Sequence, residues 1–201
     1  MTKTLRPDLE AIANLINDGS RVLDIGCSEG ELLYHLAKHK KVDARGIELA
    51  QSNVSKCVKS GLAVIQGDAD IDLKFYPEKC FDYVVSSQML QATKYPKEVL
   101  QEMLRIGKKV IVSIPNFGYW YNRVYIMLKG RMPVSETLPY QWYETPNIHF
   151  STMKDFEILC ADIGCVIENK LFLSPCGNKN VTIIPNLLGE TGVFVLSKGK
   201  S

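Results

Sequence analysis

Two glycines four residues apart follow a short apolar run near the start of the chain. The segment reads Val22-Leu-Asp24-Ile-Gly26-Cys27-Ser28-Glu29-Gly30. Because glycine has no Cβ, the N–H groups of such a turn can approach a ligand closely where the turn opens a helix. A dinucleotide-binding loop would read G-x-G-x-x-G, which does not fit this spacing. The carboxyl group of Asp24 suits a ligand that carries positive charge, so the pattern predicts a nucleotide-type loop with a cationic ligand.

Other side chains could supply catalytic groups, and the candidates are Asn116, Tyr143 and His149. A histidine titrates near neutral pH, so His149 could act as a base, and the alternative is a hydrogen-bonded structural histidine. His35 and His39 lie four residues apart, as metal ligands on a helix would. Without a third ligand we interpret them as surface residues, and we predict no metal site.

Six cysteines are scattered through the chain, with no CxxC pair and no histidine at zinc-ligand spacing from them. No secretory signal is recognised, so we interpret them as reduced, mostly buried thiols of a cytoplasmic protein. Cys27 lies within the glycine turn. We expect its thiol to pack against the ligand rather than act as a nucleophile, because no His or Asn partner is indicated.

The elements that must position these residues are alternating strands and helices. We expect helices at 8–16, 31–40, 51–60, 97–105 and, after an N-cap at Ser151, up to Gly164; strands are expected at 21–25, 42–48, 62–66, 81–86, 109–114, 166–173 and 193–197. Such alternation is typical of βαβ units. The sequence therefore predicts an α/β fold, a doubly wound, mostly parallel sheet, in one domain over residues 1–201.

The alternation stops after Ile114. Residues 115–150 are rich in Tyr, Trp, Pro and Asn, and only residues 124–128 look briefly helical. A stretch of this length without regular structure is typical of a functional lid or binding insertion. We predict a cap over about residues 117–150, with these side chains facing the pocket: Tyr119, Trp120, Tyr143 and His149.

The glycine turn and three later segments resemble class I S-adenosylmethionine-dependent methyltransferases, which have a Rossmann-like fold. The turn resembles D-x-G-x-G-x-G, with Ser28 in place of the middle glycine. The resemblance implies that Glu48 holds both ribose hydroxyls, that Asp68 and Ala69 read the adenine, and that the end of the fourth strand passes the methionine part. It assigns cofactor contacts to Asp24, Gly26, Cys27, Ser28, Gly30, Glu48, Leu49, Asp68, Ala69 and Ser86.

Features across most of the chain are similar to the MetW family of methionine biosynthesis. They are Leu5-Arg-Pro-Asp-Leu, Asp24-Ile-Gly-Cys-Ser-Glu-Gly, Pro115-Asn-Phe-Gly-Tyr-Trp, Arg131-Met-Pro-Val and His149-Phe-Ser. That resemblance implies a methyltransferase-like protein found alongside a homoserine O-acyltransferase. It does not specify a methyl acceptor.

Two departures from small-molecule methyltransferases bear on catalysis. A Leu-His-His-like run after the fourth strand is Met89-Leu-Gln91-Ala here, which removes a possible base, and a Pro-Gly-Gly turn is replaced by Arg105-Ile-Gly107-Lys. Methyl transfer depends mainly on alignment and exclusion of water, so a dedicated base is optional. Two functions stay open. One is transfer of a methyl group from S-adenosylmethionine to an unidentified acceptor, leaving S-adenosylhomocysteine; the other is a non-catalytic subunit that binds S-adenosylmethionine and modulates the acyltransferase.

Charge and hydropathy narrow the range of partners. With 24 Lys+Arg against 22 Asp+Glu, the net charge is +2, so no strong field draws the molecule to nucleic acid. No apolar run approaches the roughly 20 residues that span a bilayer. We interpret the insertion's aromatic residues as a substrate cap or a docking surface. For docking on the acyltransferase, we expect Trp120 or Trp142 to be an anchor and the insertion or the loop at 175–189 to lie in the interface.

Overall fold

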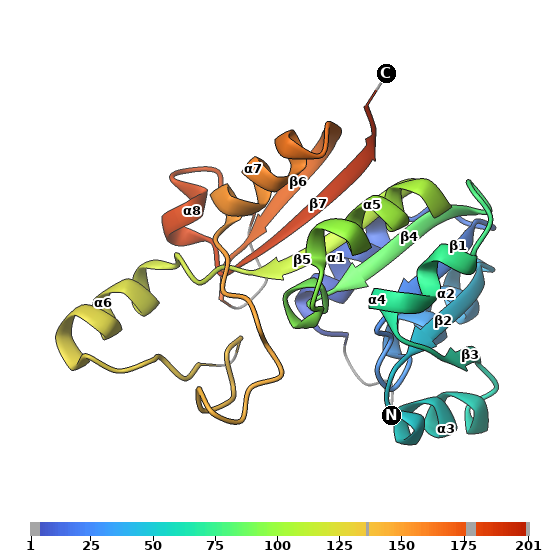
Figure 1. The fold of residues 1–201 in the computed structure, drawn as a ribbon, viewed down its shortest axis with the longest axis horizontal. Helices are drawn as coiled ribbons and strands as arrows, with labels where there is room; N and C mark the ends of the chain where they lie inside the picture. Colours follow the sequence, from blue (N-terminus) through green and yellow to red (C-terminus); the bar gives the residue numbers. More distant parts are fainter. Residues whose placement is uncertain (1–4, 136, 176–179, 200–201) are drawn as a thin grey trace.

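The computed structural model describes residues 5–135, 137–175 and 180–199. Within these ranges a seven-stranded sheet has the order β3-β2-β1-β4-β5-β7-β6 (Figure 1). The strands are β1 (Arg21–Ile25), β2 (Asp43–Glu48), β3 (Ala63–Gln66), β4 (Phe81–Ser87), β5 (Gly107–Pro115), β6 (Cys165–Leu173) and β7 (Thr191–Lys198). β1 to β5 are parallel, whereas β7 runs antiparallel to both β5 and β6. The predicted doubly wound, mostly parallel α/β fold is confirmed.

Helices cover both faces of the sheet. They are α1 (Pro7–Leu15), α2 (Glu31–Lys40), α3 (Gln51–Lys59), α4 (Ala69–Asp72), α5 (Pro96–Ile106), α6 (Trp120–Lys129), α7 (Met153–Asp162) and α8 (Pro185–Leu188), with short 3-10 turns η1 (Leu73–Phe75) and η2 (Leu90–Ala92). The buried residues of α1 and α2 pack on one face, and those of α5 and α7 pack on the other. α6 packs on neither face and projects from the body of the molecule (Figure 1).

Strand β5, which lies between β4 and β7, shows how the sequence specifies the two layers. Side chains alternate between the faces of a strand. Val110 and Val112 accordingly pack in the cluster with α5, while Ile111 packs in the cluster with α1 and α2. All three are fully buried. A strand with helices on both sides has no solvent-facing side, which explains its continuous apolar run.

Some sequence-based boundaries need correction. α7 begins after Thr152, not Ser151, because the Thr152 hydroxyl and the Asp155 carboxylate form a reciprocal capping box. The brief helical pattern at 124–128 belongs to the ten-residue helix α6. Five cysteines lie in the described ranges and are free thiols. Cys176 lies outside them.

The topology creates a ligand-binding edge. The chain moves outward from β1 to β2 and β3, and then returns to place β4 on the other side of β1. Loops that follow β1 and β4 therefore leave in opposite directions. In open α/β sheets, ligands bind at the carboxyl ends of the strands at such a switch point.

Candidate cofactor-binding site

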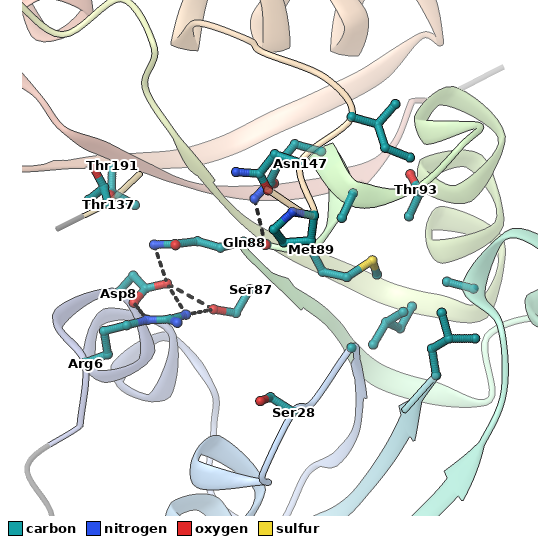
Figure 2. Close-up of a pocket in the computed structure, with 18 of the residues that line it drawn as sticks. Arg6, Asp8, Ser28, Ser87, Gln88, Met89, Thr93, Thr137, Asn147 and Thr191 are labelled. Atoms are coloured by element: carbon teal, nitrogen blue, oxygen red, sulfur yellow. Dashed lines mark hydrogen bonds and ion pairs between the residues drawn. The ribbon is translucent and has the colours of Figure 1, made fainter. Parts of the chain in front are cut away.

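A cavity of about 680 Å³ lies at the carboxyl ends of β1, β2, β3 and β4 (Figure 2). Cavities of roughly 300–1,000 Å³ are typical of small-molecule sites. Its floor is formed by residues that end these strands or directly follow them, including Gly26, Glu48 and Gly67. A smaller cavity of about 320 Å³ adjoins it and shares Arg6, Gly26, Ser28 and Ser87 with it.

Three residues of the turn after β1 have a left-handed backbone conformation. Gly26, Ser28 and Gly30 have φ of +70°, +50° and +80°. A Cβ on Gly26 would lie 2.5 Å from Met89 Cγ, so no larger residue fits without displacing the cavity wall. Ser28 keeps a positive φ at the position where the methyltransferase pattern has its middle glycine, so the backbone path of the turn is retained despite the substitution.

Glu48 connects this turn to the end of β2. Its carboxylate accepts hydrogen bonds from the N–H groups of Ser28 and Ala50, each at 2.9 Å. A carboxylate offers about four lone-pair sites, so these two bonds leave acceptor capacity for hydroxyl groups of a ligand. Glu48 is 9% exposed and lines the main cavity. Its placement suits a diol held at the end of β2.

Asp24 is a buried carboxyl group without a hydrogen-bond partner among the described residues. It is 3% exposed and lines the smaller cavity. Burial raises the pKa of Asp24 to about 7; the Arg6 guanidinium opposes this rise, and the charges of Glu48 and Asp8 add to it. A positively charged ligand would stabilise the ionised form of this buried carboxyl group.

The turn after β3 presents polar groups to the other end of the main cavity. The Asp68 carboxylate caps α4 by accepting a hydrogen bond from the Asp70 N–H at 2.9 Å, while its own N–H donates to Asp72 at 2.7 Å. Asp68, Ala69 and Asp70 line the cavity. The three turns after β1, β2 and β3 thus surround one elongated space.

The structure brings most of the predicted cofactor residues together. Six line the main cavity: Gly26, Ser28, Glu48, Leu49, Asp68 and Ala69. Asp24 and Cys27 line the smaller one. Gly30 lines neither, because its Cα faces Leu62 and Cys57 under the turn. The thiol of Cys27 packs in an apolar cluster between α2, α3 and β3 and faces Gly46.

Ser86 does not reach either cavity. It is fully buried in β4, and its hydroxyl has no hydrogen-bond partner within the described ranges. At the end of β4 the main cavity is instead lined by Ser87, Gln88 and Met89. Because successive side chains of a strand point to opposite faces, a one-residue difference moves the serine out of the site.

None of the three catalytic candidates lines either cavity. Asn116 is 2% exposed, and its amide donates to the carbonyl oxygens of Asn186 and Gly189, which gives it a structural role. Tyr143 and His149 are exposed and are not lining residues of either cavity.

The predicted cap, residues 117–150, borders the main cavity, but the side chains that line the cavity are not the expected ones. Those that line it are Thr137, Pro139, Tyr140, Pro146, Asn147 and Ile148. The expectation that Tyr119, Trp120, Tyr143 and His149 face the pocket is wrong. Two facts explain the difference: α6 carries Trp120 away from the sheet, and the N–H groups of Ile148 and His149 both donate to the Gln91 carbonyl, which sets the returning segment with Asn147 inward.

Several lining residues were not singled out from the sequence as site residues. They are Arg6, Asp8, Ser87, Gln88, Thr137, Asn147, Glu190 and Thr191. The one sequence feature that pointed to any of them was the Leu5-Arg-Pro-Asp-Leu segment, which contains Arg6 and places Asp8 in the first turn of α1.

Neither membrane spans nor metal clusters are found in the described part of the chain. Its helices are too short or too polar to cross a bilayer. No group of three or more His, Cys, Asp or Glu residues there has the arrangement of a metal site. His35 and His39 stack with ring centroids 4.8 Å apart on α2.

Comparison with known proteins identifies the family. A family model described as methionine biosynthesis protein MetW matches residues 6–196. The chain belongs to the MetW family. A relative from Rhodopirellula baltica, named bifunctional methionine biosynthesis protein MetXA/MetW, is 32% identical over 97% of this chain. The chain spans only 33% of that relative, so the MetW-type region there is one part of a longer protein.

A partial sequence match and several solved structures are methyltransferases. Ajmaline N-methyltransferase of Rauvolfia serpentina is 30% identical over 43% of this chain and 32% of its own length. A crystal structure of an S-adenosylmethionine-dependent methyltransferase from Mesorhizobium loti has a TM-score of 0.71 at 15% identity, covering 95% of this chain and 97% of that one. An Archaeoglobus fulgidus methyltransferase gives 0.70 at 18% identity over 95% and 91%. At these identities the structural likeness defines the fold alone.

Proposed function

We propose that this MetW-family protein binds S-adenosylmethionine at the carboxyl ends of β1 to β4 and transfers its methyl group to an acceptor in the same cavity. When bound, the cofactor supplies a methyl group activated by a sulfonium. The chain's own features fit such a ligand. The turn leaves no room for a Cβ at Gly26, and Asp24 is a partnerless buried carboxyl beside it.

Each part of the cofactor has a matching group in this proposal. Asp24 would face the ammonium group of the amino-acid end, Glu48 would accept the ribose hydroxyls, and Asp68 would lie at the adenine. Five acidic residues line the main cavity, against two basic ones, Arg6 and Lys94; the acidic residues are Asp8, Glu48, Asp68, Asp70 and Glu190. A chain of net charge +2 thus has an acidic cavity, which favours a cationic ligand.

The observation that supports methyl transfer is that the main cavity is longer than the part formed by the turns after β1, β2 and β3. Beyond the turns that fit a cofactor, it continues between the insertion and the start of β7, where Thr137, Glu190 and Thr191 line it. The Thr137 hydroxyl donates to the Glu190 carboxylate at 3.1 Å, so the insertion is joined to β7 across this end. These residues would hold an acceptor out of bulk water, which is the main requirement of methyl transfer.

Replacing Glu48 with Ala is expected to weaken cofactor binding by about 1.5–3 kcal/mol, because hydrogen bonds to a charged acceptor are lost. Calorimetry with S-adenosylmethionine and S-adenosylhomocysteine, on protein freed of bound ligand, measures this loss. Glu157→Ala is the control, since Glu157 lies on α7 and pairs with the exposed Lys170. Absence of binding by the wild-type protein to either ligand would refute the cofactor proposal.

Turnover is tested with a pool of small metabolites as acceptors, by following S-adenosylhomocysteine formation. The wild type is expected to form it in proportion to enzyme, and Glu48→Ala to form it more slowly at a limiting cofactor concentration. If the cofactor binds and no acceptor pool supports turnover, a catalytic role is refuted while the binding site stands.

The second candidate is a cofactor-binding subunit that modulates a homoserine O-acyltransferase. A specific observation favours association: the Rhodopirellula relative joins MetXA and MetW in one named bifunctional protein. S-adenosylmethionine is made from methionine, so a protein that binds it could report on pathway output. Acyl transfer assayed at increasing amounts of this chain, with and without S-adenosylmethionine, distinguishes this role from free-standing methyl transfer.

A further inference from the structure

The Leu5-Arg-Pro-Asp-Leu segment has no role in the function proposed above, yet it borders the site. Arg6 immediately precedes α1, and Asp8 lies in the first turn of that helix. Arg6 lines both cavities, which share Gly26, Ser28 and Ser87 with it. The guanidinium therefore stands where the two cavities meet, beside the turn after β1.

Asp8 holds this guanidinium in one orientation. Arg6 Nε lies 2.7 Å from Asp8 Oδ1, and Nη2 lies 3.1 Å from Oδ2. The Asp8 carboxylate is 2% exposed and also accepts hydrogen bonds from the hydroxyls of Ser87 at 3.0 Å and Ser113 at 2.9 Å. Figure 2 shows the bonds among Arg6, Asp8 and Ser87. Ser87 and Ser113 belong to β4 and β5, so the Arg6–Asp8 pair is anchored to the sheet. A buried carboxylate with this many donors is an orienting group.

The guanidinium still has donors to offer. Arginine carries five N–H bonds. The bonds to Asp8 use Nε and one Nη2 hydrogen, and Ser87 Oγ at 2.7 Å takes the other. The two Nη1 hydrogens have no hydrogen-bond partner in the described part of the chain, and the Arg6 side chain is 48% exposed. The Nη1 group of this fixed guanidinium can therefore donate a charge-assisted hydrogen bond to a carboxylate oxygen of a ligand.

Asp24 supplies the opposite charge nearby. It lines the smaller cavity together with Arg6, and the Arg6 charge acts directly on its carboxyl group. An arginine with free donors beside an unpartnered carboxyl is complementary to an α-amino-acid group, which bears a carboxylate and an ammonium on one carbon. Lys94, the other basic residue of the main cavity, lies next to Asp70 at the opposite, β3 end.

We propose that Arg6 binds the carboxylate of the amino-acid end of S-adenosylmethionine, with Asp8 as its positioning residue and Asp24 receiving the ammonium group. The assignment rests on the proposed cofactor site and deepens it. It gives the Leu5-Arg-Pro-Asp-Leu segment a ligand-recognition role and makes the first turn of α1 part of the site.

The test is a calorimetric cycle with two ligands that differ only in this carboxylate, S-adenosylmethionine and decarboxylated S-adenosylmethionine. Arg6→Met is expected to weaken S-adenosylmethionine binding about tenfold or more, since it removes charge-assisted hydrogen bonds. Binding of the decarboxylated ligand is expected to change less than about twofold, because no carboxylate is present to lose its partner. Arg6→Lys should recover part of the loss. Lys94→Met, which removes the other cavity cation, should leave the preference between the two ligands unchanged.

Three outcomes overturn the inference. Equal weakening of both ligands in Arg6→Met assigns Arg6 a structural role only, and unchanged binding of S-adenosylmethionine assigns it none. If the wild type binds neither ligand, the cofactor site itself fails, which is distinct from the first two results. Should Arg6→Met not fold because Asp8 is left unpaired, the Arg6→Met/Asp8→Asn double variant is carried through the same cycle, since it removes that buried charge.

Discussion

Replacing Asp24 with Asn is expected to stabilise the protein above neutral pH while weakening cofactor binding. Burial raises the pKa of Asp24 from its usual 3.8 to about 7. The folded protein therefore holds this proton more tightly than the unfolded chain, and the stability that the protonated group contributes is lost as the pH rises toward 7. Asn mimics the neutral acid and does not ionise, so the variant avoids this loss.

The gap in unfolding free energy between Asp24→Asn and the wild type is expected to widen by roughly 2–3 kcal/mol from pH 5 to pH 8. Urea unfolding of ligand-free protein at both pH values measures it. A gap that does not depend on pH would show that Asp24 ionises normally in the folded state. Calorimetry on the same variant should show weaker S-adenosylmethionine binding, because an amide cannot neutralise the ammonium group.

Asp82→Asn is a control whose effect on the free energy of unfolding should depend on pH in the opposite way. Asp82 lies at the other end of β4, where the Arg21 N–H and the Lys108 ammonium hold the pKa of its carboxyl below the usual range. A lowered pKa contributes stability at neutral pH that is lost on acidification. The effect of Asp82→Asn is therefore expected to be a destabilisation that shrinks as the pH falls through the acid range.

Placing charges on the exposed face of α6 is expected to weaken association with a homoserine O-acyltransferase strongly. Asn122 is the only buried residue of this helix. Its apolar side chains Trp120, Tyr121, Val124, Met127 and Leu128 are exposed, with Met127 at 74% and Leu128 at 70%. Their spacing places them on one side of the helix. An exposed apolar face of this kind on a projecting helix is typical of a protein-docking surface.

The proposed occupant is the acyltransferase, because a relative carries MetXA and MetW in one chain. Met127→Glu/Leu128→Glu is expected to reduce the affinity by about a hundredfold or more, since two apolar anchors become charges that must be desolvated. Co-purification from one host and titration of the purified proteins measure this loss. Trp120→Ala should cost more than about 1 kcal/mol if that side chain is an anchor.

Ile158→Glu is the matched control for this experiment. Ile158 is 62% exposed on α7, outside the α6 face. It is expected to leave association unchanged. If the α6 double variant and Ile158→Glu bind the acyltransferase as the wild type does, α6 is not the docking surface. If the wild type does not bind it at all, the partner proposal fails with it.

The sequence by itself predicted the seven strands in order, five of the eight α-helices in the described part of the chain, and the strand ends that surround the candidate site. The reason is local: Asp24, Gly26 and Glu48 lie in or directly after apolar runs that alternate with helices, and parallel strands place their carboxyl ends at one edge. Register confirms the arrangement, since Asp24 pairs with Gly46 and Ile25 with Ile47. Residues close to a strand end need no long-range information to be placed at that edge.

Single-residue placements were decided by register and packing. Ser86 and Ser87 are adjacent and chemically identical, yet Ser86 is buried opposite Val112, while Ser87 pairs with Ser113 and lines the cavity. Which serine faces the ligand depends on where β4 ends relative to β5, and composition carries no information about that. The same holds for Cys27, whose thiol direction is set by Gly46 and Leu33 on neighbouring elements.

Only the tertiary structure placed the Arg6–Asp8 pair and the insertion. Asp8 reaches Ser87 and Ser113, which lie 79 and 105 residues further along the chain, because α1 packs on the sheet beside β4 and β5. In the insertion, the Gln91 carbonyl anchors residues 148 and 149, so Asn147 rather than His149 faces the cavity. Contacts of this range depend on how whole elements pack, and the local spacing of residue types does not encode them.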